Sequence, residues 1–197
     1  MILYLHGFRS SPQSTKARQL AARLEARGAT RETGERYACP ALSVSPAAAA
    51  RAIEDLVRDL GKDEPLSVVG SSLGGYYATW IAERVDCRVV LLNPAVYPDR
   101  DLAHHLGTQP VYHTNETVEV KPEYLAELQT LATGPVTRPE RYLLVAATGD
   151  EVLDWREMVA RYPDAVHCIV EGSDHGLSGF ASLVDDVIDF CLDRPRG

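Results

Sequence analysis

The chain has 197 residues, of which 45% are hydrophobic, enough to bury one sizeable core, so one domain over residues 1–197 is expected. A net charge of −8, a pI near 5.2 and the lack of a basic, aromatic-rich stripe argue against nucleic acid. A strand pattern from Ile2 leaves no room for a signal peptide, and no apolar run is long enough to span a bilayer. We therefore expect a cytoplasmic protein that does not bind membranes.

Strand and helix patterns alternate along most of the chain. Strands are predicted over Ile2–Leu5, 35–43, 66–69, Cys87–Leu92, Tyr142–Ala147 and Val166–Val170. Helices are predicted over 15–27, 46–60, 73–83, Trp155–Arg161 and 180–192. This alternation predicts an α/β fold with a mostly parallel sheet of about six strands and helices on both faces.

A G-x-S-x-G pentapeptide, residues 70–74, joins the strand pattern before it to a helical pattern after it. A serine on such a tight strand-to-helix turn has a strained backbone, so Gly70 and Gly74 supply the small residues needed two positions to either side. The pattern therefore predicts Ser72, and not Ser71, as a nucleophile. The pentapeptide alone also fits a Gly/Ser turn in an ordinary α/β unit.

A nucleophilic serine needs a base and an acid that orients the base, and in hydrolases of this kind they follow in the order Ser, Asp or Glu, His. Asp150 follows the predicted strand Tyr142–Ala147, and His175 lies in the polar turn after Val166–Val170. Asp154 and Asp174 are the rival acids. Asp154 is better placed to start the next helix, and Asp174 is adjacent to His175, so we favour Asp150.

The loop after the first predicted strand is expected to complete an oxyanion hole, formed by the backbone N–H groups of Phe8 and Leu73. Gly7 lets this loop turn tightly. His6 is expected to hold the loop in shape through hydrogen bonds to the backbone.

The chain resembles the YqiA-type esterases, small bacterial α/β-hydrolases also classed as an uncharacterised-protein family. The resemblance rests on residues 3–8, 10–12, 69–80, 93–96, 148–154 and 174–180. It implies an α/β-hydrolase fold with Ser72 as nucleophile, Asp150 as acid and His175 as base. It also implies hydrolysis of small-molecule short-chain esters and acyl-CoA thioesters through an acyl-serine, without a cofactor. A peptidase or lactonase with the same triad, or a binding protein on this fold, remains an alternative.

Residues 93–139 interrupt the alternation, with only short helical patterns near 99–106 and 122–131. By analogy of fold we expect this insertion to be a lid that covers Ser72, with Leu102 and Leu106 shaping the acyl pocket; a solvated loop is the alternative. His104, His105 and His113 are expected to be surface histidines rather than metal ligands, because no carboxylate lies at ligand spacing. The four cysteines are scattered, and we expect reduced thiols.

Overall fold

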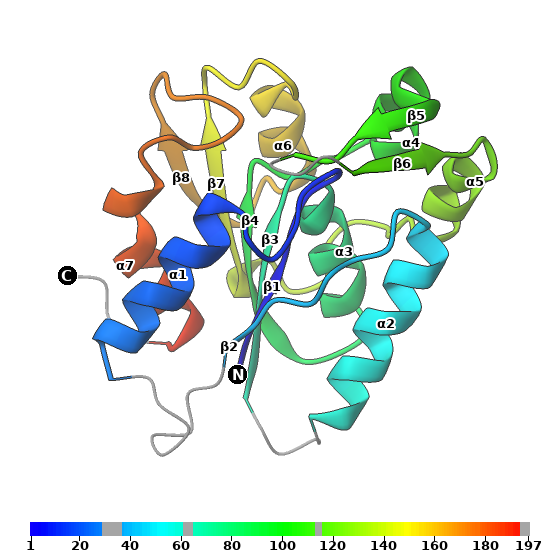
Figure 1. Ribbon diagram of the computed structural model, residues 1–197. Helices are drawn as coiled ribbons and strands as arrows, with labels where there is room; N and C mark the ends of the chain where they lie inside the picture. The colour runs from blue at the N-terminus through cyan, green and yellow to red at the C-terminus, as the bar shows by residue number, and fades with distance from the viewer. Residues whose placement is uncertain (29–36, 61–64, 113–115, 194–197) are drawn as a thin grey trace.

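A six-stranded parallel sheet forms the centre of the computed structural model, which describes residues 1–28, 37–60, 65–112 and 116–193 (Figure 1). In spatial order the strands are β2 (Tyr37–Ala38), β1 (Ile2–Leu5), β3 (Leu66–Ser71), β4 (Cys87–Leu92), β7 (Tyr142–Ala147) and β8 (Val166–Val170). All neighbouring pairs are parallel, which confirms the predicted sheet. The carboxyl ends of the strands therefore meet at one edge of the sheet, where sites in α/β folds form.

Helices cover both faces of this sheet, as predicted (Figure 1). One face is covered by α1 (Thr15–Ala26) and α7 (Val184–Cys191), and the other by α2 (Pro46–Asp59), α3 (Leu73–Ala82) and α6 (Trp155–Arg161). Successive side chains of β1 point to opposite faces of the sheet. Leu3 and Leu5 therefore belong to the hydrophobic cluster on one face, and Ile2 and Tyr4 to the cluster on the other.

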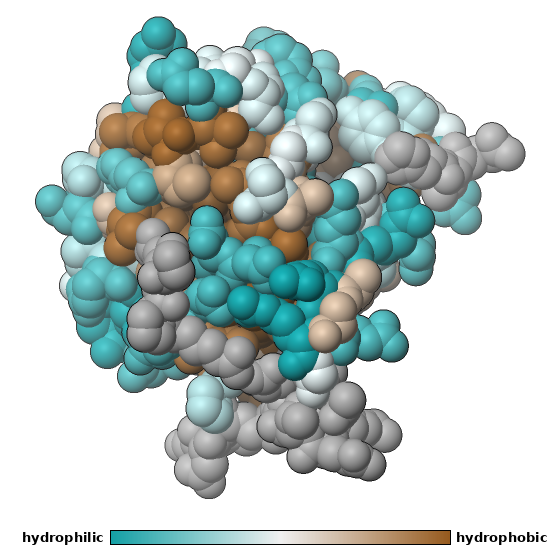
Figure 2. Space-filling view, turned by 90° about the vertical axis from the view of Figure 1, so that its left-hand side faces the viewer, coloured by the Kyte–Doolittle hydropathy of each residue, from teal (hydrophilic) through white to brown (hydrophobic). Residues whose placement is uncertain are grey.

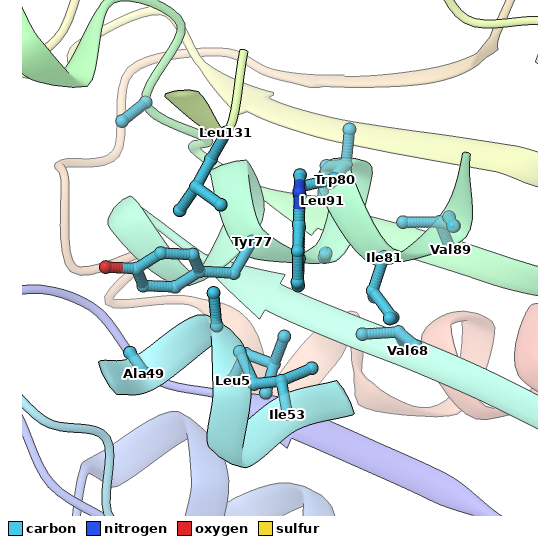
Figure 3. Packing of buried hydrophobic residues seen from close by; sticks show 14 of the residues in the cluster. Leu5, Ala49, Ile53, Val68, Tyr77, Trp80, Ile81, Val89, Leu91 and Leu131 are labelled. Atoms are coloured by element: carbon cyan, nitrogen blue, oxygen red, sulfur yellow. The ribbon is translucent and has the colours of Figure 1, made fainter. Parts of the chain in front are cut away.

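The larger cluster packs α2 and α3 against the sheet. Leu5 of β1, Ile53 of α2 and Tyr77 of α3 meet between these layers, each no more than 1% exposed (Figure 3). Burial of such side chains contributes about 1.5–3 kcal/mol each. This packing holds β3 and α3, the two elements that flank Ser72, in a fixed relation.

Two predicted elements differ from the structure by more than one or two residues at an end. Of the strand expected over 35–43, only Tyr37–Ala38 is strand; residues 35–36 lie outside the described residues, and Pro40, which has no N–H to donate, follows shortly after. The helix expected over 180–192 divides into a 3-10 turn, η3 (Phe180–Ser182), and α7. A further 3-10 turn, η2 (Pro139–Arg141), leads into β7.

β8 is the edge strand on the left of Figure 1, and Figure 2 shows hydrophobic residues gathered on that side of the molecule. Ile169 of this strand is 39% exposed. No helix among the described residues is long and apolar enough to cross a bilayer.

The insertion after β4 contains a β-hairpin that the sequence did not predict. The short helical segments of the insertion are α4 (Pro98–Leu102), the 3-10 turn η1 (Ala103–His105) and α5 (Glu123–Thr130). Between them β5 (Gly107–Pro110) and β6 (Thr117–Val120) pair antiparallel. Each strand has only four residues. β5 is mostly exposed, and its sequence lacks the alternation of apolar and polar residues from which a strand is predicted.

Candidate active site

Ser72 lies on a sharp turn between β3 and α3, at the carboxyl edge of the sheet. Its backbone has φ 54° and ψ −122°, a strained conformation for a residue with a side chain. A Cβ on Gly74 would lie 2.0 Å from the carbonyl oxygen of Leu5, and one on Gly70 would lie 2.4 Å from that of Gly74. The two glycines of the pentapeptide are therefore required by close backbone contacts around the turn.

The structure brings Ser72, His175 and Asp150 together from three loops. His175 Nε2 lies 3.1 Å from Ser72 Oγ, and His175 Nδ1 lies 2.8 Å from Asp150 Oδ2. The Asp150 side chain is fully buried, whereas that of His175 is 22% exposed. The other Asp150 oxygen accepts hydrogen bonds from the backbone N–H groups of Val152 and Leu153, at 2.8 and 2.9 Å. These bonds fix the carboxylate in the orientation that meets the imidazole.

The rival acids have other partners. Asp154 caps α6 by accepting a hydrogen bond from the backbone N–H of Arg156 at 2.9 Å, as its place before the helix suggested. Asp174 accepts hydrogen bonds from the backbone N–H and the hydroxyl of Ser178, and these bonds lower the pKa of its carboxyl. Neither carboxylate is bonded to the His175 ring.

The loop after β1 presents the second predicted oxyanion donor beside Ser72. A Cβ on Gly7 would lie 3.0 Å from the Cβ of Ser72, closer than most Cβ contacts, so a side chain here would press on the nucleophile. No hydrogen-bond partner is found among the described residues for the backbone N–H groups of Phe8 and Leu73. His6 behaves as expected: its Nδ1 lies 3.0 Å from the Gly7 carbonyl oxygen.

Asn93, which follows β4, is a site residue that sequence reasoning missed. It is fully buried with φ 44°, and its side-chain amide donates to the carbonyl oxygens of Asp174 and His175, at 3.1 and 3.2 Å. The side-chain oxygen Oδ1 of Asn93 accepts a hydrogen bond from the backbone N–H of Ala147 at 2.8 Å. Asn93 thus joins the ends of β4 and β7 to the loop of His175. The sequence feature that could have identified Asn93 is its position directly after the buried strand β4.

A cavity of about 370 Å³ opens onto Ser72 and His175, and the insertion forms part of its wall through His105 and Tyr112. His105 is half-buried and packs against Phe8 with ring centroids 5.7 Å apart. His104 is exposed, and His113 lies outside the described residues.

The leucines expected to shape the pocket do not line this cavity. Leu102 is buried in the core on the α2/α3 side, and Leu106 is 42% exposed. The hydrophobic pattern identified them as apolar residues of a helix, but in the fold that helix ends at Leu102 and the chain turns at η1.

Arg9 connects the loop after β1 to the hairpin of the insertion. Its Nε donates to the Pro110 carbonyl oxygen at 2.6 Å, and its guanidinium carbon lies 4.5 Å from the centre of the Tyr112 ring. The backbone N–H of Tyr112 in turn donates to the Arg9 carbonyl oxygen at 2.9 Å. The insertion is therefore held directly against the segment that presents Phe8.

None of the four cysteines, which all lie within the described residues, forms a disulfide bond. Burial raises the pKa of Cys87 and Cys191 to about 12 and that of Cys39 to about 11, so these thiols are protonated and unreactive at neutral pH. Among the described residues no group of three His, Cys, Asp or Glu side chains is arranged to hold a metal ion.

The sheet order and the turn at Ser72 are those of an α/β-hydrolase fold, and comparison with solved structures supports this class. Est1E from Butyrivibrio proteoclasticus, with ferulic acid bound, aligns at a TM-score of 0.71 and 15% identity, covering 98% of this chain and 89% of that chain. An esterase domain from Rhodothermus marinus aligns at a TM-score of 0.65 and 18% identity, covering 95% of this chain and 83% of that chain. Mouse alpha/beta hydrolase domain-containing protein 10 aligns at a TM-score of 0.68 and 17% identity, covering 95% of this chain and 89% of that chain.

Within this class the chain belongs to the uncharacterised protein family UPF0227, whose family model matches residues 1–192. This is the YqiA-like family indicated by the sequence motifs.

Proposed function

We propose that the protein is a serine hydrolase that cleaves short-chain carboxylic esters, and acyl-CoA thioesters, through Ser72, His175 and Asp150. The observation that carries the proposal is the continuous chain of contacts from Asp150 Oδ2 through the imidazole to Ser72 Oγ. Nucleophile, base and orienting acid are the three groups that acyl transfer requires. Their place on loops beside a cavity leaves the serine accessible to substrate.

In the proposed reaction the Ser72 hydroxyl attacks the carbonyl carbon while His175 Nε2 takes its proton. The buried carboxylate of Asp150 holds the ring in place and stabilises the imidazolium. The backbone N–H groups of Phe8 and Leu73 donate to the oxyanion. His175 then gives the proton to the departing alcohol or thiol. Water, activated by the same histidine, hydrolyses the acyl-serine and restores the free hydroxyl.

The surroundings of the proposed oxyanion hole favour short acyl groups. A second cavity of about 60 Å³ borders Phe8 and Leu73. Its apolar wall consists of side chains from the loop after β2 and from the hairpin, Leu42, Val44, Val111 and Val118. This volume suits a few methylene groups. A peptidase or lactonase would use the same triad, and only its substrates would distinguish it.

The test is a panel of p-nitrophenyl acyl esters, acyl-CoA thioesters, lactones and peptides, assayed with the wild type and Ser72→Ala. We expect ester turnover, measurable thioester turnover and no peptide turnover, with a loss of roughly 10⁴-fold or more in kcat for Ser72→Ala. Ser71→Ala, at the neighbouring hydroxyl, is the matched control and should have a far smaller effect. A fluorophosphonate adduct at any residue other than Ser72 would refute the assignment.

A further inference from the structure

The first turn of α1 opens onto the same cavity as Ser72. Ser14, Thr15 and Lys16 all line that cavity. The N-cap Ser14 makes no capping hydrogen bond, the first turn contains no acidic residue, and α1 is 12 residues long. Among the described residues no partner is found for the backbone N–H groups of residues 15–17. The positive end of the helix dipole therefore faces a cavity whose described lining contains no carboxylate.

Lys16 adds a full charge to this end of the cavity. Its Nζ donates to the carbonyl oxygen of Gly176 at 2.8 Å, and a lysine ammonium has three donors in all. Burial lowers the pKa of Lys16 to about 8, while Asp174 and Asp150 favour its charged form, so at neutral pH the ammonium is mostly charged. Because Gly176 follows His175, this charge lies beside the proposed general base.

A third observation is the hydroxyl of Ser14, which is shielded from solvent and whose side-chain neighbour is the Tyr4 hydroxyl. It is a donor group on the wall of the same cavity.

The charge of the cavity wall is opposite to that of the protein. The chain has 28 acidic and 20 basic residues, yet Arg9 and Lys16 line the cavity and no aspartate or glutamate does so among the described residues. A cavity with one sign of charge attracts a ligand of the other sign.

We propose that the substrate carries an anionic oxygen group, a carboxylate or a phosphate, on its alcohol portion close to the ester oxygen, bound by Lys16 and the first turn of α1. The proton of His175 must reach the departing oxygen, so the alcohol portion lies against His175 and its substituent meets Lys16. This inference rests on the proposed function and names the substrate class of that site.

The experiment compares 4-acetoxybenzoate with its methyl ester, which share the acyl group and differ in charge. 4-Acetoxyphenyl phosphate forms a third arm that distinguishes phosphate from carboxylate. For each substrate kcat/KM is divided by the rate of its hydroxide-catalysed hydrolysis, which corrects for the leaving group. We expect the wild type to prefer the anionic esters after this correction.

Lys16→Gln should lower the ratio of anionic to neutral ester about tenfold, the effect of losing about 1.4 kcal/mol of binding to the charged group. Lys16→Arg keeps the charge and should retain most of the preference. Lys121→Gln removes an exposed lysine that does not line the cavity and should leave the ratio unchanged.

Ser72-dependent hydrolysis with no anionic preference in the wild type, or a preference that survives Lys16→Gln, would overturn this inference and leave the proposed function standing. The wild-type comparison decides the matter even if Lys16→Gln does not fold. Absence of hydrolysis of all three esters, together with no fluorophosphonate labelling of Ser72, would instead defeat the proposed function and this inference with it.

Discussion

The side-chain amide of Asn93 donates a hydrogen bond to the backbone carbonyl oxygen of His175 over 3.2 Å. The two residues are far apart in the chain, and this contact holds the histidine loop against the end of β4. The same amide also binds the carbonyl oxygen of Asp174. The position of the proposed general base therefore depends on a side chain that need not touch the substrate.

Asn93→Ala should lower both kcat and stability. The substitution leaves the buried N–H of Ala147 and two carbonyl oxygens without their partner, which costs roughly 1–3 kcal/mol for each buried group that water cannot reach. Urea unfolding and ester kinetics measure the two effects. Gln129→Ala removes an exposed amide that does not line the cavity at Ser72 and serves as the control. An Asn93→Ala enzyme with wild-type kcat would show that His175 is held by other contacts.

Asp150→Asn should reduce kcat about 10²–10⁴-fold at neutral pH, because an amide cannot stabilise the imidazolium and favours the wrong tautomer. Asp174→Asn and Asp154→Asn are matched controls on the two neighbouring carboxylates and should reduce kcat much less. Asp154→Asn retains a capping side chain for α6, so its stability should change little. Equal losses of kcat in Asp150→Asn and Asp174→Asn would contradict the assigned acid.

Stability should fall as the pH decreases below the ordinary pKa of histidine, because of His6. Burial lowers the pKa of His6 below 6.5, and its Nε2 accepts a hydrogen bond from the backbone N–H of Leu42 at 3.1 Å. Below that pH the unfolded chain binds a proton that the folded protein does not. The free energy of unfolding then decreases by up to ~1.4 kcal/mol for each pH unit until the folded-state pKa is reached.

Urea unfolding at about pH 7.5 and about pH 5.5 measures this effect. The decrease in the free energy of unfolding between the two conditions should be smaller for His6→Gln than for the wild type. His104→Gln, at an exposed histidine, should retain the full decrease. Identical decreases in all three proteins would mean that other groups carry the pH dependence.

Val118→Ala should change the preference for acyl chain length, because it enlarges the cavity of about 60 Å³ that borders Phe8 and Leu73. Each methylene that the enlarged cavity newly buries adds about 0.8 kcal/mol, roughly fourfold in kcat/KM. The measurement is a series from acetate to hexanoate esters. Leu106→Ala removes another apolar side chain of the insertion, one outside the wall of this cavity, and should keep the wild-type profile. If both variants keep that profile, the acyl group lies elsewhere.

Ser72, Asp150 and His175 could be proposed as a triad from the sequence because each has a local signal. The turn at Ser72 has no room for a side chain at Gly70 or Gly74. Because these glycines lie only two positions from Ser72, the steric requirement appears in the sequence as a short motif. Asp150 and His175 each follow a strand pattern, and parallel strands bring their carboxyl ends to one edge. The hydrophobic alternation that identifies these strands also determined the two-layered core.

The tertiary structure alone decided which distant groups meet around Ser72. Asn93 reaches the carbonyl of His175, Arg9 binds the hairpin, and Lys16 bonds to Gly176 across 160 positions of the chain. Nothing in the immediate neighbourhood of these residues specifies such a partner, since a polar side chain on a loop or in a first helical turn is equally compatible with solvent. Their contacts arise only when the sheet and its helices pack, which brings together backbone and side-chain groups that the sequence keeps far apart.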